Sequence, residues 1–440
     1  MPTFPYFESL KSLLARRLVR TTGIYTLSSV ANSAVPFLLI PVFTRYLTPH
    51  DYGVLALMMA VLGFVSPLVS LSLAGGYVAA HYREPPAVSQ QFLAWALWFP
   101  CIAGTFLSLT GWVSFPLWSG MSPGLSASKG WILLLPLYSA VVLFSSTYTQ
   151  RLQAHQRPVA FFAFQISQTV VIASLSLIFI IPYEGGWQGR LLAMWVGQSL
   201  FALVVVGLLW RERCLSRPRF VGTVKALFGF GLRLFPHAFS SPMMGLADRF
   251  VLAHALGAAV TGQYALAMQV GMIIEMVGSS FGQAWTPYLF EKLKTNSKAS
   301  RMRVAQATAL AVSLWIVLGI ASALVIPMLF PWLVGKKFQS AGSLIPWACL
   351  TSTFGAIYHV FVGHLFYYGK TGRLSAASFG SGVVKIVLAY VLVGPFGATG
   401  IAVSGCIASG LLVCAVVAMS GRISPLPWRA AIGSSWGGLR

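Results

Sequence analysis

Repeated apolar segments of about 20 residues, long enough to cross a bilayer, constrain this chain more than any other feature. Of its 440 residues, 57% are hydrophobic and 9% are charged, whereas a soluble globular domain has about 25% charged residues. Inside a bilayer, only helices and closed barrels satisfy every backbone polar group. The sequence therefore predicts an all-α membrane protein with about 12 transmembrane helices. The segments lie near residues 18–43, 52–80, 91–118, 131–150, 159–182, 190–210, 228–256, 262–290, 304–330, 342–367, 374–394 and 398–420.

The lysines and arginines lie mostly in alternate connections between these segments. With the N-terminus placed in the cytoplasm, 22 of the 30 basic residues fall in inner connections, 5 in outer ones and 3 within segments. Because such an excess marks the cytoplasmic side of a membrane protein, both termini are predicted to be cytoplasmic. The first 20 residues are expected to be a retained lead-in and not a signal peptide. Topology thus accounts for the net charge of +22, and nucleic acid is not a predicted partner.

The longest polar connection divides the segments into two sets of six. It spans residues 211–227, and it predicts an N-terminal lobe over 1–210 and a C-terminal lobe over 228–440. Since each set has an even number of segments, both sets begin on the cytoplasmic side. This arrangement predicts two pseudo-symmetric six-helix lobes around a central cleft, related by an axis along the membrane normal.

A short internal repeat agrees with this division. Residues 45–58, RYLTPHDYGVLALM, align with residues 254–267, HALGAAVTGQYALA, at a constant offset of 209. Gly53 then corresponds to Gly262, at the turn between the first two segments of each half.

The segment that starts the second half carries four ionisable residues, Arg233, His237, Asp248 and Arg249. At 100° per residue, positions 233, 237 and 248 share one helical face. A charged side chain facing lipid costs at least about 2.5–3.5 kcal/mol at the bilayer centre. We therefore expect this face to line a cavity that binds an anionic cargo. Snorkelling to the headgroups remains the alternative for Arg233 and Arg249.

Two further ionisable residues, Glu275 and Lys385, lie near the centres of later segments. Both are too deep for their side chains to reach an interface, since a helix rises about 1.5 Å per residue. Glu275 is a candidate proton carrier, with Asp248 as the second ion-coupling candidate; a fixed pair with Arg233 or Lys385 is the alternative. Lys385 shares a polar stripe with serines and is expected to face the cleft or Glu275.

No pattern typical of an enzyme or a metal site is found. The five cysteines form no CxxC pair, and His359 and His364 have no carboxylate or cysteine companions in the sequence that would make a zinc site. Nothing resembles a phosphate-binding glycine-rich loop or a catalytic triad. The chain is predicted not to be an enzyme, and no cofactor or metal is expected.

Two motifs resemble a known family of exporters. RYLTPHDYGVLAL, after the first segment, resembles the turn motif of Wzx-type polysaccharide flippases of the multidrug/oligosaccharidyl-lipid/polysaccharide superfamily. The run DRFVLAHALGAAVTGQYALAMQVG, with AWTPYLFEK after it, looks like the start of their second half. This resemblance implies translocation of an undecaprenyl-diphosphate-linked oligosaccharide across the bacterial inner membrane for surface polysaccharide biosynthesis, by cation- or proton-coupled alternating access.

The resemblance also implies which residues and partners take part. The substrate-binding candidates are Arg233, His237, Arg249 and Lys385, which would attract the diphosphate. A polysaccharide polymerase and a chain-length regulator are implied partners, besides the lipid bilayer. The N-terminal lobe is nearly free of charged residues. This departs from an arrangement in which both lobes bind the anionic cargo.

Two other functions stay open at this point. A multidrug or small-cation antiporter of the same superfamily would need acidic residues to hold its cargo. In the segments, however, bases outnumber acids three to two. A non-transporting membrane scaffold for polysaccharide assembly would not require buried charges on a common helical face.

Overall fold

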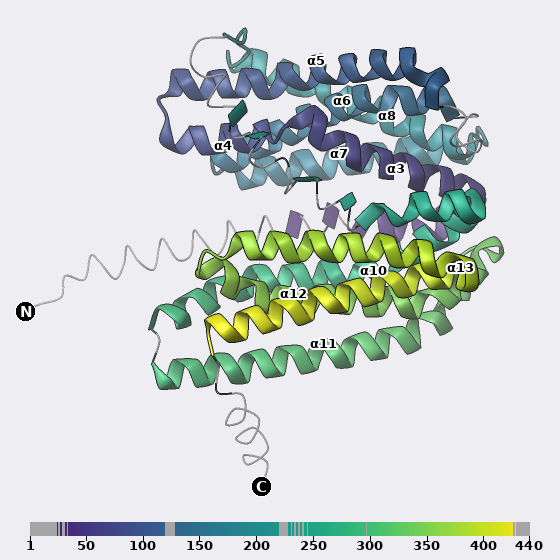
Figure 1. The fold of residues 1–440 in the computed structure, drawn as a ribbon. Coiled ribbons are helices and arrows are strands. Elements are labelled where there is room, and N and C mark those ends of the chain that lie inside the picture. The colour runs from purple at the N-terminus through teal and green to yellow at the C-terminus, as the bar shows by residue number, and fades with distance from the viewer. Residues whose placement is uncertain are drawn as a thin grey trace, which may run out of the picture. The chain divides into compact units, whose positions relative to one another are not determined.

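A computed structural model describes most of the chain, and every regular element within its described residues is a helix (Figure 1). By its internal contacts the chain forms two compact units. Unit 1 comprises Met1–Ile40 and Val61–Phe239, and unit 2 comprises Pro41–Ala60 and Ser240–Arg440. The predicted lobes, residues 1–210 and 228–440, stay a prediction. The described residues are 24, 27, 28, 31, 32, 34–118, 128–219, 228, 229, 231, 232, 235, 238, 239, 242, 243, 245–295, 297–425 and 427.

Unit 1 is a bundle of long apolar helices. Its core is aromatic, with Tyr148, Phe164 and Phe201 packed in sequence on one another. The predicted segment over residues 52–80 is divided, because Leu71 and Ser72 have positive φ values of 43° and 54°. The helices are the second half of α3 (Pro49–Ser70), then α4 (Leu73–Arg83), α5 (Pro86–Trp118), α6 (Lys129–Ala154), α7 (Pro158–Ile180) and α8 (Gly186–Arg211).

The chain after α8 lies on unit 1 as far as Arg219. Glu212 forms an ion pair with Arg151 of α6. At Arg219, the backbone N–H donates to Gln91 Oε1 at 2.9 Å, and the carbonyl accepts from Trp95 Nε1 at 3.2 Å. The first half of the predicted linker is therefore fastened to α5 and α6.

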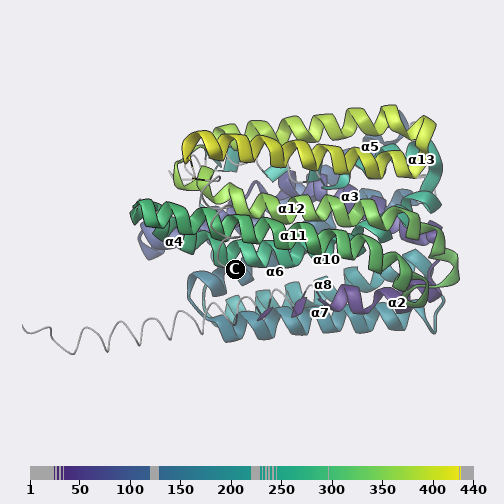
Figure 2. The same cartoon turned by 90° about the horizontal axis from the view of Figure 1, so that it is seen from below.

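Unit 2 contains the helices that carry the candidate site. Figures 1 and 2 show α10 to α13 running side by side. Gly257 and Gly397 have φ values of 84° and 57°, a left-handed conformation that glycine adopts readily, so α10 and α13 are each two helices joined at a glycine. The helices are α2 (Ile40–Tyr46), the start of α3, α10 (Asp248–Thr295), α11 (Lys298–Leu333), the 3₁₀ helix η3 (Lys336–Leu344), α12 (Ile345–Tyr367) and α13 (Thr371–Ile423).

The start of α3 packs closely on α10 within unit 2. A Cβ built on Gly53 would lie 1.7 Å from the carbonyl oxygen of Ala258, and one built on Gly262 would lie 2.0 Å from that of Pro49. No side chain fits at either position. The two glycines that the internal repeat aligns are therefore the points at which these helices touch.

The helices have the lengths of membrane spans. Within the described ranges, nine are long and apolar enough to cross a bilayer, with α10 and α13 each counted once although both are divided by a glycine. The all-helical membrane fold is thus confirmed, while the number of twelve helices stays a prediction.

Candidate functional site

A buried cluster of charges lies in unit 2, around Asp248. The Lys385 Nζ lies 2.8 Å from Asp248 Oδ2, and the Tyr264 hydroxyl donates to the same oxygen at 2.5 Å. The Arg249 Nη1 lies 3.6 Å from Asp248 Oδ1. Asp248 is 1% exposed and Lys385 is 5% exposed, so water does not screen this cluster as it does a surface pair.

The turn at Gly257 brings Asp248 and Tyr264 together. Asp248 lies nine residues before this glycine and Tyr264 seven after it, on two helices that fold back on each other. At about 1.5 Å per residue, both lie roughly 10–14 Å from the turn, inside the hydrocarbon region. Lys385 reaches them from the first half of α13. Three stretches of chain thus build one polar site among apolar helices.

Among the described residues, the cluster carries more positive than negative charge. One carboxylate faces two cations, Lys385 and Arg249, and Arg249 Nη1 also donates to the Gly245 carbonyl at 2.5 Å. Asp248 Oδ1 accepts no hydrogen bond in the described part of the chain. A buried charge without full compensation is expensive. Such a site can take up an anion, which would complete the neutralisation.

Glu275 lies apart from this cluster, on the long second half of α10. Its carboxylate rests against α12, where a Cβ built on Gly355 would be 2.7 Å from Glu275 Oε2. Glu275 forms no ion pair with Lys385, whose carboxylate partner is Asp248. The alternative of a fixed Glu275–Lys385 pair is therefore wrong in this conformation. Glu275 is exposed at the surface of the described helices.

Two of the predicted site residues cannot be placed, and two residues that were not predicted take part in buried polar contacts. Arg233 and His237 lie outside the described residues. Tyr264 was not predictable as a site residue, because an aromatic residue at helical spacing ordinarily belongs to the core. Its place seven residues after the turn at Gly257 was the only signal in the sequence. Arg151 was predicted to lie in a cytoplasmic connection, whereas it is buried within α6 beside Glu212.

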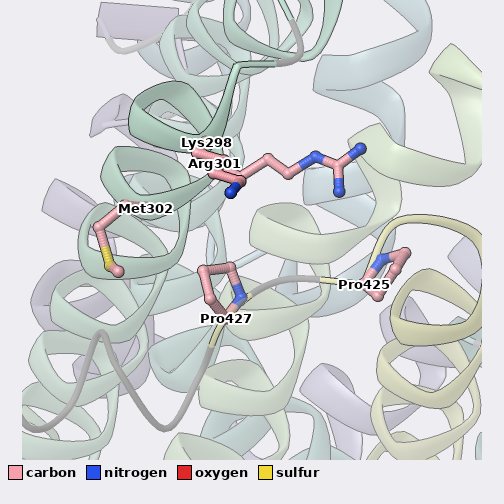
Figure 3. Close-up of a pocket in the computed structure, with 5 residues that line it drawn as sticks. All are labelled: Lys298, Arg301, Met302, Pro425 and Pro427. Carbon is pink, nitrogen blue, oxygen red and sulfur yellow. The ribbon is translucent and has the colours of Figure 1, made fainter.

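A pocket of about 430 Å³ opens at the start of α11 (Figure 3). In Figure 3, three residues of α11 face two prolines that follow α13. No predicted site residue contributes to its lining, so the pocket is separate from the Asp248 cluster. It is lined by Lys298, Arg301, Met302, Pro425 and Pro427.

Several known proteins are similar to this chain. Among curated proteins, Lsg locus putative protein 1 of Haemophilus influenzae is 23% identical over 378 residues, covering 84% of this chain and 90% of the relative. An uncharacterized membrane protein of the same organism is 25% identical over 375 residues, covering 82% and 87%.

Solved structures show the same fold. The inward-facing form of a multidrug resistance MATE family transporter of the MOP superfamily aligns with a TM-score of 0.66 at 15% identity, over 89% of this chain and 95% of that one. Lipid II flippase MurJ, in an inward closed conformation, aligns with a TM-score of 0.66 at 12% identity, over 91% and 87%. At these identities the likeness concerns the fold alone.

A match to a protein-family model shows the family to which this chain belongs. The model of the polysaccharide biosynthesis protein family matches residues 18–292, more than half of the sequence. The family is one of polysaccharide biosynthesis, as the resemblance to Wzx-type flippases implies, and the fold is the one seen in these two solved structures. The chain is a multi-pass membrane protein of the polysaccharide biosynthesis protein family.

Proposed function

We propose that this protein flips a polyprenyl-diphosphate-linked oligosaccharide across the bacterial inner membrane, with both termini in the cytoplasm. The observation that carries this proposal is that two cations, Lys385 and Arg249, lie beside the single carboxylate of Asp248 among the described residues. A diphosphate headgroup is the anionic part of such a lipid and does not cross hydrocarbon unaided. The polyprenyl tail can stay in the bilayer throughout.

The cluster suggests how the headgroup is held. In this conformation Lys385 and Arg249 both form ion pairs with the carboxylate of Asp248. A diphosphate offers more negative charge than one carboxylate, and the guanidinium of Arg249 can bind phosphate oxygens in a bidentate manner. When the headgroup binds, Lys385 and Arg249 would exchange the carboxylate of Asp248 for the diphosphate. When it leaves, they would pair with Asp248 again. Asp248 thus keeps the cations compensated between cycles.

We further propose that movement of the predicted lobes is coupled to a proton at Glu275. This carboxylate lies within a membrane helix, has no ion-pair partner among the described residues and reaches the helix surface. A lipid-facing carboxylate would be unfavourable, so a water-filled surface is the favoured environment. A proton bound more tightly in one conformation shifts the equilibrium toward it.

A small-cation exporter is less favoured as an alternative. Its cargo would need a free carboxylate, but Asp248 already has Lys385 and Arg249 beside it. Glu275 alone remains for that role. A polysaccharide polymerase and a chain-length regulator are the partners we propose, because the flipped unit must next be polymerised.

Replacement of the two cations tests the proposed cargo. Arg249→Gln and Lys385→Gln should each lower polysaccharide export in a strain lacking the native gene far more than they lower protein abundance. Arg303→Gln, on the exposed start of α11, is the matched control and should export normally. Normal export by both cluster variants would show that these cations do not hold the cargo.

Glu275→Gln tests the coupling. In proteoliposomes, binding of the lipid-linked oligosaccharide should persist, while the dependence of flipping on an imposed pH gradient should disappear. Unchanged gradient dependence in a well-folded Glu275→Gln protein would rule out this role.

A further inference from the structure

Two ionisable side chains on neighbouring helices, Glu275 of α10 and His359 of α12, lack polar partners. Neither forms a hydrogen bond or ion pair with another described residue; His359 has only an aromatic contact, with the ring of Tyr358 at 5.5 Å. Both lie in helices long and apolar enough to span a membrane. Ionisable groups are rare there and usually belong to ion or proton pathways. We therefore consider the roles of Glu275 and His359 together.

Both side chains lie in the same interface. A Cβ built on Gly355 of α12 would lie 2.7 Å from Glu275 Oε2, and one built on Gly282 of α10 would lie 3.0 Å from the Cβ and 3.5 Å from the Nδ1 of His359. Each group thus rests on a glycine of the opposite helix. Gly355 and His359 are one helical turn apart, or about 6 Å along α12, so the two groups lie at successive turns of this interface.

Polar groups extend this line in both directions along α12. Toward Asp248, a Cβ built on Gly405 would lie 3.7 Å from Lys385 Cε and 4.0 Å from Thr351 Oγ1. In the other direction, a Cβ built on Gly363 would lie 3.9 Å from Thr286 Oγ1. The positions of α12 on this line recur every four residues, so they share one face of the helix. They are Thr351, Gly355, His359 and Gly363.

We propose that Glu275 and His359 form a proton-transfer pair, bridged by water, in the α10–α12 interface. The pair deepens, and rests on, the proposed proton-coupled function. The carboxyl group of Glu275 gives its proton to the water, and the water gives one of its own to a ring nitrogen of His359. One O–H bond breaks, one N–H bond forms, and the water is regenerated.

Few other ionisable side chains of the described residues lie near this interface. From α10 the facing ionisable group is Glu275, and from α13 it is Lys385, which Asp248 holds at 2.8 Å. On α12 itself, Tyr358 lies beside His359. His364 is buried, and its Nδ1 lies 3.3 Å from the carbonyl of Phe361. His364 is therefore a matched histidine on the same helix, off the line of Thr351, Gly355, His359 and Gly363.

Infrared titration of the full chain in lipid nanodiscs tests the pair without any substrate. Glu275→Gln identifies the carboxyl band of Glu275 by its loss. His359→Gln should then shift the pH midpoint of that band by about one to two units, the effect of a unit charge roughly 6 Å away at an effective dielectric constant of about 20. His364→Gln should leave the midpoint unchanged.

The same experiment contains the outcome that overturns the proposal, namely a midpoint equal in the wild type and in His359→Gln. If His359→Gln does not fold, Gly355→Ala provides the second test, because the added methyl group displaces the carboxylate from α12. It must also move the midpoint. A shifted midpoint in a protein that flips no lipid-linked oligosaccharide would refute the flippase and leave the proton pair standing.

Discussion

Replacing Asp248 by Asn removes the carboxylate that Lys385 and Arg249 contact among the described residues, and should both destabilise the protein and free these cations. At an effective dielectric constant of about 20, a unit charge pair contributes about 6 kcal/mol at the 2.8 Å of Lys385 and about 4.6 kcal/mol at the 3.6 Å of Arg249. Desolvation offsets much of this attraction. Breaking a buried ion pair on one side costs about 3–5 kcal/mol, and we expect a loss in that range for Asp248→Asn.

The measurement is the free energy of unfolding in detergent, by denaturant titration. The double variant Asp248→Asn with Lys385→Met should recover most of the loss, because it no longer buries an ammonium group that has lost the carboxylate of Asp248. Glu291→Gln is the control: it breaks a surface pair with Lys292 in which the glutamate side chain is 71% exposed, and should change stability by about 1 kcal/mol or less.

The freed cations provide a second readout of the same variant. A water-soluble diphosphate amphiphile should stabilise Asp248→Asn more than the wild type, because a ligand that binds the folded state raises its stability. The reasoning would be refuted if Asp248→Asn were as stable as the wild type, or if the double variant were no more stable than the single one.

Three further predictions concern helix packing, the pH dependence of stability and membrane topology. Gly53→Val should lower the thermal stability in detergent sharply, because even a Cβ there would lie 1.7 Å from the Ala258 carbonyl oxygen; Gly130→Val, with open space around it, should not, and equal melting of the two would contradict the packing. Partial burial, the Arg151 guanidinium and the ring of His81 lower the pKa of His155, so the wild type should lose stability as the pH falls below about 6.5. His155→Asn should lose less between pH 7.5 and 5.5, and parallel curves would argue against this. Reporter fusions should report cytoplasm after Arg219 and Arg303 and the outer side after Lys129 and Lys337; two inverted results would overturn the topology.

The parts of the fold that hydropathy and glycine turns determine were predictable from the sequence. Apolar length predicts membrane helices, and the expected ends of two segments fall beside Gly257 and Gly397, where the structure divides α10 and α13. A residue that permits positive φ in an apolar run carries that information locally. The break at Leu71 and Ser72 was not predictable in this way, since neither residue favours the conformation.

The candidate site was only half predictable. A charge in an apolar segment is visible in the sequence, so Asp248, Glu275 and Lys385 could be singled out. Which base meets which acid depends on how α10 and α13 pack, and hydropathy does not encode that pairing. Lys385 therefore has Asp248 as its partner, and not Glu275. The role of Gly355, which leaves room for a carboxylate, appears only when α12 is set against α10.

The membership of residues 41–60 in unit 2 has a consequence for how the protein is made. Thr44 Oγ1 accepts from the Gly335 N–H across 291 residues of chain, and the Tyr52 hydroxyl donates to Gln269 across 217. At about 5–20 residues per second, the ribosome delivers Gly335 roughly 15–60 s after Thr44. During that time the start of α3 is in the membrane with its packing surface uncovered. Biogenesis thus includes a waiting period in which a chaperone or insertase would have to shield Gly53 and its neighbours.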